Sequence, residues 1–163
     1  REENAKVTRR YREVAQTASQ LKQEREELTE KVTLAAKLDA VGIVVTPIDS
    51  RGKTAKKIKK TDKIKITFSI AKNVTAEVGE KYIYARIVKP DGDVLVKDRA
   101  DVFPFEDREI NYSCRKLIEY TGEELNDVTM YWAVEEFLYP GEYRVDIFAD
   151  NYMIGTRSFT LKQ

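Results

Sequence analysis

The spacing of apolar residues changes once along this chain of 163 residues, near residue 40. Before that point apolar side chains recur in alternating steps of three and four, the period that lets a helix present one narrow apolar stripe to a partner helix. Eight of the nine positions at this spacing are apolar, whereas the other twenty positions between 7 and 35 hold only Ala15 and Leu34 as apolar residues. The pattern predicts a long helix whose coiled-coil seam is Val7, Tyr11, Val14, Ala18, Leu21, Arg25, Leu28, Val32 and Ala35.

The seam has weak points, which leave three interpretations of the helix open. With Tyr11 at heptad position a, Ala18 and Arg25 also occupy position a, and small or charged residues there weaken helix pairing. We expect a self-associating coiled coil that makes the chain a homo-oligomer, a dimer in the simplest case. The alternatives are a helix that lies on its own domain, and a helix that pairs with a missing partner or an upstream segment.

The end of this helix is expected to contact the domain that follows. Leu34, Leu38 and Val41 have the i, i+4, i+7 spacing of one helical face and are rotated off the seam, so the last turns should dock onto that domain. Gly42 suits a helix stop. We therefore predict a helix over residues 1–40 and a separate domain over 41–163.

From residue 43 onward the apolar period falls to two, which is typical of half-buried β-strands. The segment 63–70, KIKITFSI, alternates most regularly, and PDGD at 90–93 and Asp150-Asn151 supply turn residues. Segment 109–127 is the least regular, and a helical turn within it is an open alternative. The pattern predicts a mainly β domain, an antiparallel β-sandwich of seven to eight strands, with strands at 43–48, 63–70, 81–88, 94–98, 109–120, 128–137, 142–149 and 152–161.

The last predicted hairpin, PGEYRVDIFADNYMIGTRSFTL, resembles the closing strand pair of immunoglobulin-like and fibronectin type III-like bacterial domains. The resemblance places Tyr143 at the tyrosine corner of such domains, and Val145 two residues later, where antibody domains carry a cysteine. The chain departs from the antibody pattern because it has a single cysteine and because Trp132 comes late in the sequence. The resemblance implies an immunoglobulin-like fold and, since this fold hosts many functions, no particular activity.

The composition excludes most catalytic chemistry. The chain has no histidine and one cysteine, Cys114, which rules out His-based triads, an intrachain disulfide and a zinc site built from cysteines. The GKT triplet at 52–54 lacks the glycine that a phosphate-binding loop needs five positions earlier, where Pro47 stands. No stretch approaches the roughly 20 apolar residues of a membrane-spanning helix. We predict no catalytic, cofactor-binding or metal-binding residues, and therefore no enzyme.

One strongly charged segment interrupts an otherwise balanced chain. The whole sequence has 29 basic and 28 acidic residues, but residues 51–72 hold nine basic residues against one acid. Such a segment could bind nucleic acid or an anionic membrane. It contains no aromatic residue for base stacking before Phe68, so we favour a solvated loop beside a lysine-protected edge strand. The possible anion-binding residues are Arg51, Lys53, Lys56, Lys57, Lys59 and Lys60.

These patterns together predict a non-enzymatic interaction or scaffold module. The helix would mediate self-association or spacing, and the β-domain would present a binding surface to another protein. The arrangement resembles envelope-associated bacterial proteins, which implies the envelope or periplasm, with the cytoplasm left open. One alternative is a glycan- or small-ligand-binding β-sandwich that uses surface aromatics such as Tyr82, Tyr131 and Tyr139. Another is an electrostatic binder of nucleic acid or anionic membrane through the loop 51–65.

Overall fold

The computed structural model describes residues 35–163. The predicted helix seam therefore lies outside the described residues, apart from an exposed Ala35, and the coiled coil stays a prediction. Within 35–163 the chain forms nine strands and one 3-10 turn, and no helix of this part could span a membrane. The strands are β1 (Ala40–Ile48), β2 (Lys63–Ile70), β3 (Gly79–Val88), β4 (Val102–Phe105), β5 (Arg108–Asn111), β6 (Cys114–Tyr120), β7 (Leu125–Ala133), β8 (Gly141–Ala149) and β9 (Tyr152–Leu161), and the 3-10 turn is η1 (Ile58–Lys60).

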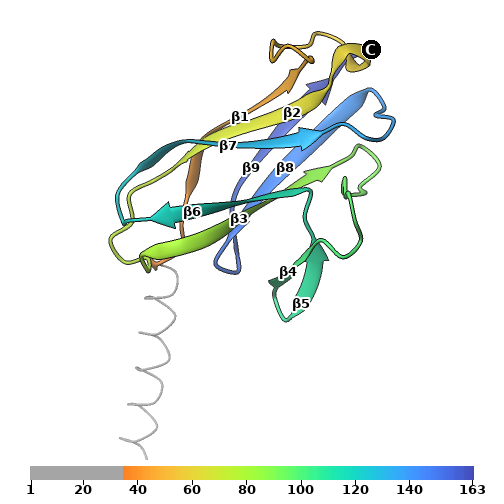
Figure 1. The fold of residues 1–163 in the computed structure, drawn as a ribbon. Coiled ribbons are helices and arrows are strands. Elements are labelled where there is room, and N and C mark those ends of the chain that lie inside the picture. The colour runs from red at the N-terminus through yellow and green to blue at the C-terminus, as the bar shows by residue number, and fades with distance from the viewer. Residues whose placement is uncertain (1–34) are drawn as a thin grey trace, which may run out of the picture. The chain divides into compact units, whose positions relative to one another are not determined.

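The strands form two antiparallel sheets and a separate hairpin (Figure 1). One sheet has the order β1-β2-β7 and the other the order β6-β3-β8-β9, while β4 and β5 pair only with each other. The alternating residues of β2 illustrate the core, because Ile64, Ile66 and Phe68 are buried while Lys65 and Thr67 between them are half-exposed. These side chains meet those of β3 and β8 in one apolar cluster between the two sheets. The prediction of a mainly β, antiparallel domain is confirmed.

The predicted helix does not continue to residue 40, and this part of the prediction is wrong. Residues 37–39 form neither helix nor strand, and β1 begins at Ala40. Leu38 does dock, with 1% of its surface exposed, but it does so from this irregular segment, and Val41 is exposed. Gly42 lies inside β1 with φ +62°, at the bulge between Val41 and Val44, so it serves a strand irregularity and not a helix stop.

The strand prediction holds for most segments but fails at 94–98, within 109–120 and at β4, which it did not include. The segment 94–98 is not a strand, since only Val94 makes a bridge, to Val88. The segment 109–120 divides into β5 and β6 at Tyr112 and Ser113, where the buried Ser113 hydroxyl donates to the Leu95 carbonyl at 2.6 Å and accepts the Ile87 N–H at 2.8 Å. The helical alternative for 109–127 is wrong, because the segment runs through β5, β6 and the start of β7.

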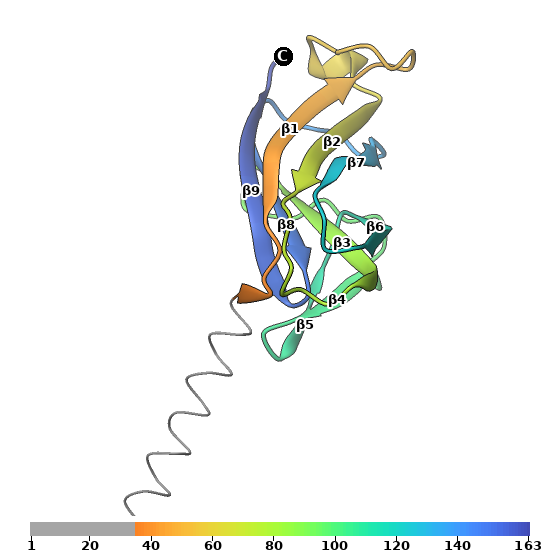
Figure 2. The ribbon, with the colours of Figure 1, turned by 90° about the vertical axis from the view of Figure 1, so that its left-hand side faces the viewer.

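The hairpin β4–β5 pairs with neither sheet and covers the outer side of β3 and β8 (Figures 1 and 2). Phe103 of β4 stacks on Tyr84 of β3 with the ring centroids 4.4 Å apart, and it also meets Phe148 of β8 at 5.3 Å. Tyr112 joins this aromatic cluster. The hairpin is tied to the β8–β9 turn, where the Glu106 N–H donates to the Asn151 side chain at 3.1 Å. A second, smaller core therefore lies outside the sandwich.

Candidate functional site

The predicted anion-binding residues lie in the loop 49–62 between β1 and β2, at the end of the domain that also holds the C-terminus (Figure 1). Main-chain hydrogen bonds fix this loop, which we call the basic loop. The Ala55 N–H donates to the Pro47 carbonyl at 2.8 Å, and the Ile58 N–H donates to the Lys162 carbonyl at 2.9 Å. Ala55 is buried, so the loop has a small apolar anchor of its own. The basic residues are therefore held by an ordered backbone.

The side chains of the basic loop point into solvent. Arg51, Lys53, Lys56, Lys57, Lys59 and Lys60 are all exposed, and within 35–163 none of them forms an ion pair. The Asp49 carboxylate is the one acid that contacts the start of the loop, where it accepts the main-chain N–H groups of Lys53 and Arg51, and these bonds lower its pKa. The loop thus presents six exposed basic side chains and two acids, Asp49 and Asp62, on a backbone held by hydrogen bonds.

The aromatic residues considered for sugar stacking do not gather on one surface. Tyr131 is 51% exposed, whereas its neighbour Trp132 is 1% exposed, as their alternation predicts. Tyr139 meets Phe137 edge-on, with an interplanar angle of 82°, and Tyr82 is tilted by 31° from Tyr84. In the described part of the chain these exposed rings form no coplanar pair on which a sugar ring would lie.

A second exposed surface, which the sequence did not single out, lies on the outer side of β3 and β6. Tyr82 and Leu117 are register partners across the two strands and are 44% and 46% exposed. The exposed Arg115 guanidinium lies over the Tyr82 ring, 4.9 Å from its centroid, and it also approaches the Tyr112 ring at 5.6 Å. We call Tyr82, Arg115 and Leu117 the β3–β6 patch. These three residues are neighbours only because of the register between β3 and β6, and this register cannot be predicted from the sequence alone.

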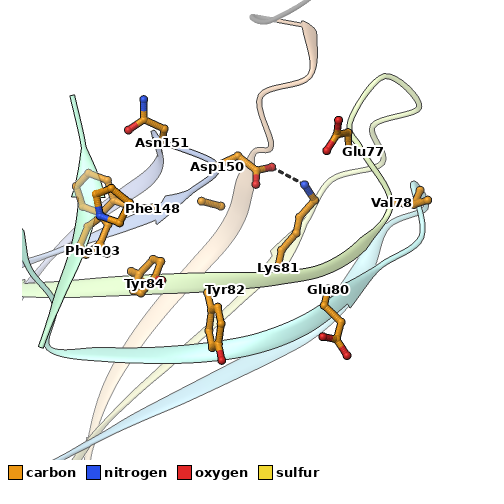
Figure 3. A pocket seen from close by; sticks show the side chains of 12 residues that line it. Glu77, Val78, Glu80, Lys81, Tyr82, Tyr84, Phe103, Phe148, Asp150 and Asn151 are labelled. Carbon is orange, nitrogen blue, oxygen red and sulfur yellow. Dashed lines mark hydrogen bonds and ion pairs between the residues drawn. The ribbon is translucent and has the colours of Figure 1, made fainter. Parts of the chain in front are cut away.

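Beside this patch lies a pocket of about 350 Å³, where β3 and β8 part (Figure 3). The β3–β8 ladder begins at Tyr84 and Phe148, so the preceding residues of β3 pair with β6 alone. The pocket opens between this part of β3 and the β8–β9 turn. The Lys81 ammonium crosses it to the Asp150 carboxylate at 2.6 Å. The further lining residues include Glu77, Val78, Glu80, Phe103, Pro104 and Asn151.

The ionisable groups inside the fold serve packing. Burial raises the pKa of the Cys114 thiol to about 12, so this cysteine is protonated and unreactive at neutral pH. The buried Asp146 carboxylate accepts the Thr156 hydroxyl at 2.7 Å and the Arg144 Nε at 3.0 Å. Desolvation lowers the pKa of the nearby Arg86, although the charge of Asp146 opposes this shift. Among residues 35–163, no group of three or more His, Cys, Asp or Glu residues could hold a metal ion.

The fold and these surfaces define a small antiparallel β-domain with two exposed features, a basic loop and an aromatic patch beside a pocket. A family model described as a domain of unknown function, DUF8428, matches residues 41–162, and the chain belongs to this family. The search of curated proteins finds no match. The family description names no activity, so any function has to be argued from the surfaces themselves.

Two of the solved structures that match this chain do so with TM-scores below 0.5. The alkylpurine DNA glycosylase AlkC of Pseudomonas fluorescens, bound to DNA containing an abasic site analog, is 16% identical with a TM-score of 0.43, and the match covers 81% of this chain. The β-glucosidase of Kluyveromyces marxianus is 13% identical with a TM-score of 0.45, and the match covers 78% of this chain. The chain spans 32% of the glycosylase and 14% of the glucosidase.

Proposed function

We propose that this chain is a non-enzymatic interaction module with an immunoglobulin-like fold, and that it binds another protein through the β3–β6 patch. The strand order supports the fold. One sheet contains β1, β2 and β7, and the other contains β3, β6, β8 and β9, so each sheet combines strands from the first and the second half of the domain, as in immunoglobulin-like sandwiches. A tyrosine corner supports it too. Tyr143, near the start of β8, donates its hydroxyl hydrogen to the Tyr139 carbonyl at 2.7 Å, and Val145 is buried two residues later.

The composition of the β3–β6 patch is the observation that carries the binding proposal. Tyrosine and arginine are enriched among the few residues that supply most of the energy of protein interfaces, and a lone exposed apolar residue is ordinary. Here Tyr82 and Leu117 are exposed side by side, and Arg115 is already stacked on the tyrosine ring. The backbone of all three lies in a hydrogen-bonded sheet, so little backbone freedom remains to be lost on binding.

A site-specific photo-crosslinker tests this proposal. With the crosslinking amino acid at position 82, we expect one discrete product with a second protein in cells that produce the full chain. Position 153 is the matched control, because Met153 is equally exposed, at 44%, but lies on β9. The product should disappear when Leu117→Ser is added. Equal product patterns at positions 82 and 153 would contradict a dedicated surface.

The N-terminal segment belongs to the same proposal. We infer that its seam from Val7 to Ala35 pairs with a second copy, so that the module is displayed at least twice on one assembly. Multiple copies raise the apparent affinity of a weak surface without any new contact. The proposed location is the bacterial envelope or periplasm, where a coil would serve as a spacer for the domain.

The basic loop favours a second candidate function, the binding of an anionic polymer. The specific observation is six exposed cations, none of which forms an ion pair within residues 35–163, on a backbone held by hydrogen bonds. Retention on a heparin column tests it. The double variant Lys56→Gln/Lys57→Gln should elute at clearly lower salt than the control Lys72→Gln/Arg157→Gln, which removes the same charge from other exposed sites. Equal shifts would show only a general charge effect and would reject the loop as a site.

A further inference from the structure

Strand β3 has a free edge inside its sheet. From Gly79 to Ala85 it pairs with β6 on one side, but on the other side its ladder with β8 starts only at Tyr84. The β8–β9 turn, with Asp150 and Asn151 both at positive φ, folds away before it reaches the first half of β3. We call the resulting gap between Gly79–Ile83 and Ala149–Asn151 the β3 notch; it is the pocket of Figure 3.

The backbone of β3 shows which main-chain groups face the notch. The Ala85 carbonyl accepts the Ser113 N–H at 2.8 Å, on the β6 side, so the N–H and C=O groups of odd-numbered residues point toward β6. Those of Glu80 and Tyr82 therefore point toward the notch. Neither residue has a main-chain partner across the gap in the described part of the chain. Two donors and two acceptors thus stand at the spacing of an extended strand.

The walls of the notch differ along its length. At one end Tyr84, Phe103 and Phe148 form an aromatic wall, and at the other Glu77 faces the gap (Figure 3). The Lys81–Asp150 ion pair lies between them. The side chains of Glu80 and Tyr82 point to the opposite side of β3 from this ion pair, so they do not fill the space in front of their own backbone groups. An incoming chain would meet an apolar surface first and then carboxylates.

We propose that the β3 notch binds an extended, lysine- or arginine-containing segment of the partner protein by strand addition to β3. This inference rests on the proposed function and names the partner segment for that surface. Main-chain hydrogen bonds to Glu80 and Tyr82 give the register, as in other complexes in which a peptide extends a sheet. One apolar side chain of the segment packs against Tyr84 and Phe103. A cationic side chain takes the place of the Lys81 ammonium beside Asp150 and Glu77.

Hydrogen exchange of single amides, followed by NMR, tests the premise in the free protein. The amides of Glu80 and Tyr82 should exchange fast, while those of Lys81 and Ile83, which face β6, should be protected. Equal protection of all four amides would show that the edge is already closed, and the proposal would be wrong.

Peptide binding tests the proposal itself on the full chain. The probe is acetyl-Thr-Val-Lys-Val-Thr-amide, and its binding should slow exchange at Glu80 and Tyr82. The same peptide N-methylated at both valines loses two N–H donors and should bind about tenfold more weakly or not at all. The version with Gln for Lys should bind several-fold more weakly, by a margin that shrinks in high salt. No protection at Glu80 and Tyr82 with the lysine peptide, or equal binding of the N-methylated one, would overturn strand addition.

A pair of lysine variants tests the role of the ion pair. Lys81→Met removes the ammonium that competes for Asp150 and should strengthen binding of the lysine peptide several-fold. Lys72→Met removes an equal charge from an exposed site away from the notch and should leave binding unchanged. A melting temperature close to that of the unmodified chain shows that Lys81→Met is folded, and unchanged or weaker binding by the folded variant counts against the proposal. If the crosslink at position 82 persists while the lysine peptide fails, the β3–β6 patch stands and strand addition alone is wrong; if the crosslink also fails, the proposed function is wrong.

Discussion

At the scale of single residues, the Tyr143 hydroxyl makes the contact that most directly supports the proposed immunoglobulin-like fold. Its ring is buried beside Phe159, and its hydroxyl donates to the Tyr139 carbonyl. Tyr143→Phe keeps the ring but leaves that carbonyl without its partner, so we expect a loss of about 1 kcal/mol in unfolding free energy, measured in urea. Tyr139→Phe is the control, because its exposed ring can change while its carbonyl remains. A smaller loss of unfolding free energy for Tyr143→Phe than for Tyr139→Phe would show that the hydrogen bond from Tyr143 does not stabilise the domain.

Residue environments could be predicted from the sequence only where they depend on alternation along one strand. The opposite burial of Tyr131 and Trp132 follows from the period of two, and the structure confirms it. The burial of Cys114, which raises the pKa of its thiol, depends in contrast on the packing of the whole domain. The exposure of Tyr82 beside Leu117 depends instead on the β3–β6 register, and the free backbone groups of Glu80 and Tyr82 depend on where β8 turns away. No local sequence pattern encodes the exposure of this pair or the free backbone groups.

At the scale of elements, β1 packs closely against β9, and the absence of a side chain at Gly155 permits this contact. A Cβ at Gly155 would lie 2.7 Å from the Ile43 Cδ1 and 2.9 Å from the Ala40 Cβ. Gly155→Ala should therefore force the strands apart and lower the unfolding free energy by about 1–3 kcal/mol, as overpacking does. The measurement is urea unfolding, with Ser158→Ala on the same strand as the exposed control. Equal stabilities of the two variants would mean that β1 shifts without cost.

The strands that the sequence predicted correctly are those whose signals are local. Segment 63–70 alternates cleanly and forms β2 with the same bounds, and Asp150-Asn151 forms the tight turn between β8 and β9. Strand β4 was missed, because Pro104 interrupts an already short run and pairing with β5 provides its only ladder. The break between β5 and β6 was missed because it depends on the bonds of Ser113 to Leu95 and Ile87, which are distant in sequence.

At the scale of the whole molecule, the boundary between the N-terminal segment and the domain decides how self-association should be tested. A boundary between two units of the chain follows Ala36, and the domain uses the residues that come directly after it. Leu38 is part of the core, the Lys37 carbonyl accepts the Asn73 side-chain N–H at 2.9 Å, and the Asp39 carbonyl accepts the Ala71 N–H at 3.0 Å. A truncation at residue 40 would remove these contacts, and burial of a leucine alone is worth roughly 2 kcal/mol. The fragment to compare with the full chain is therefore 37–163.

The solution masses of 1–163 and 37–163, measured by light scattering over a range of concentrations, test the predicted coil. We expect the full chain to be a dimer or larger and the fragment to be a monomer, because the seam from Val7 to Val32 would then supply the association. Leu21→Glu in the full chain is the matched variant. A charge at a central seam position should reduce the mass to that of a monomer, and no residue of the domain is changed. A fragment that associates as strongly as the full chain would assign the contact to the β-domain. The β3–β6 patch would then be the first surface to mutate. A monomeric full chain would show that the seam does not pair with a second copy, and that any multivalent display of the module has to come from another protein.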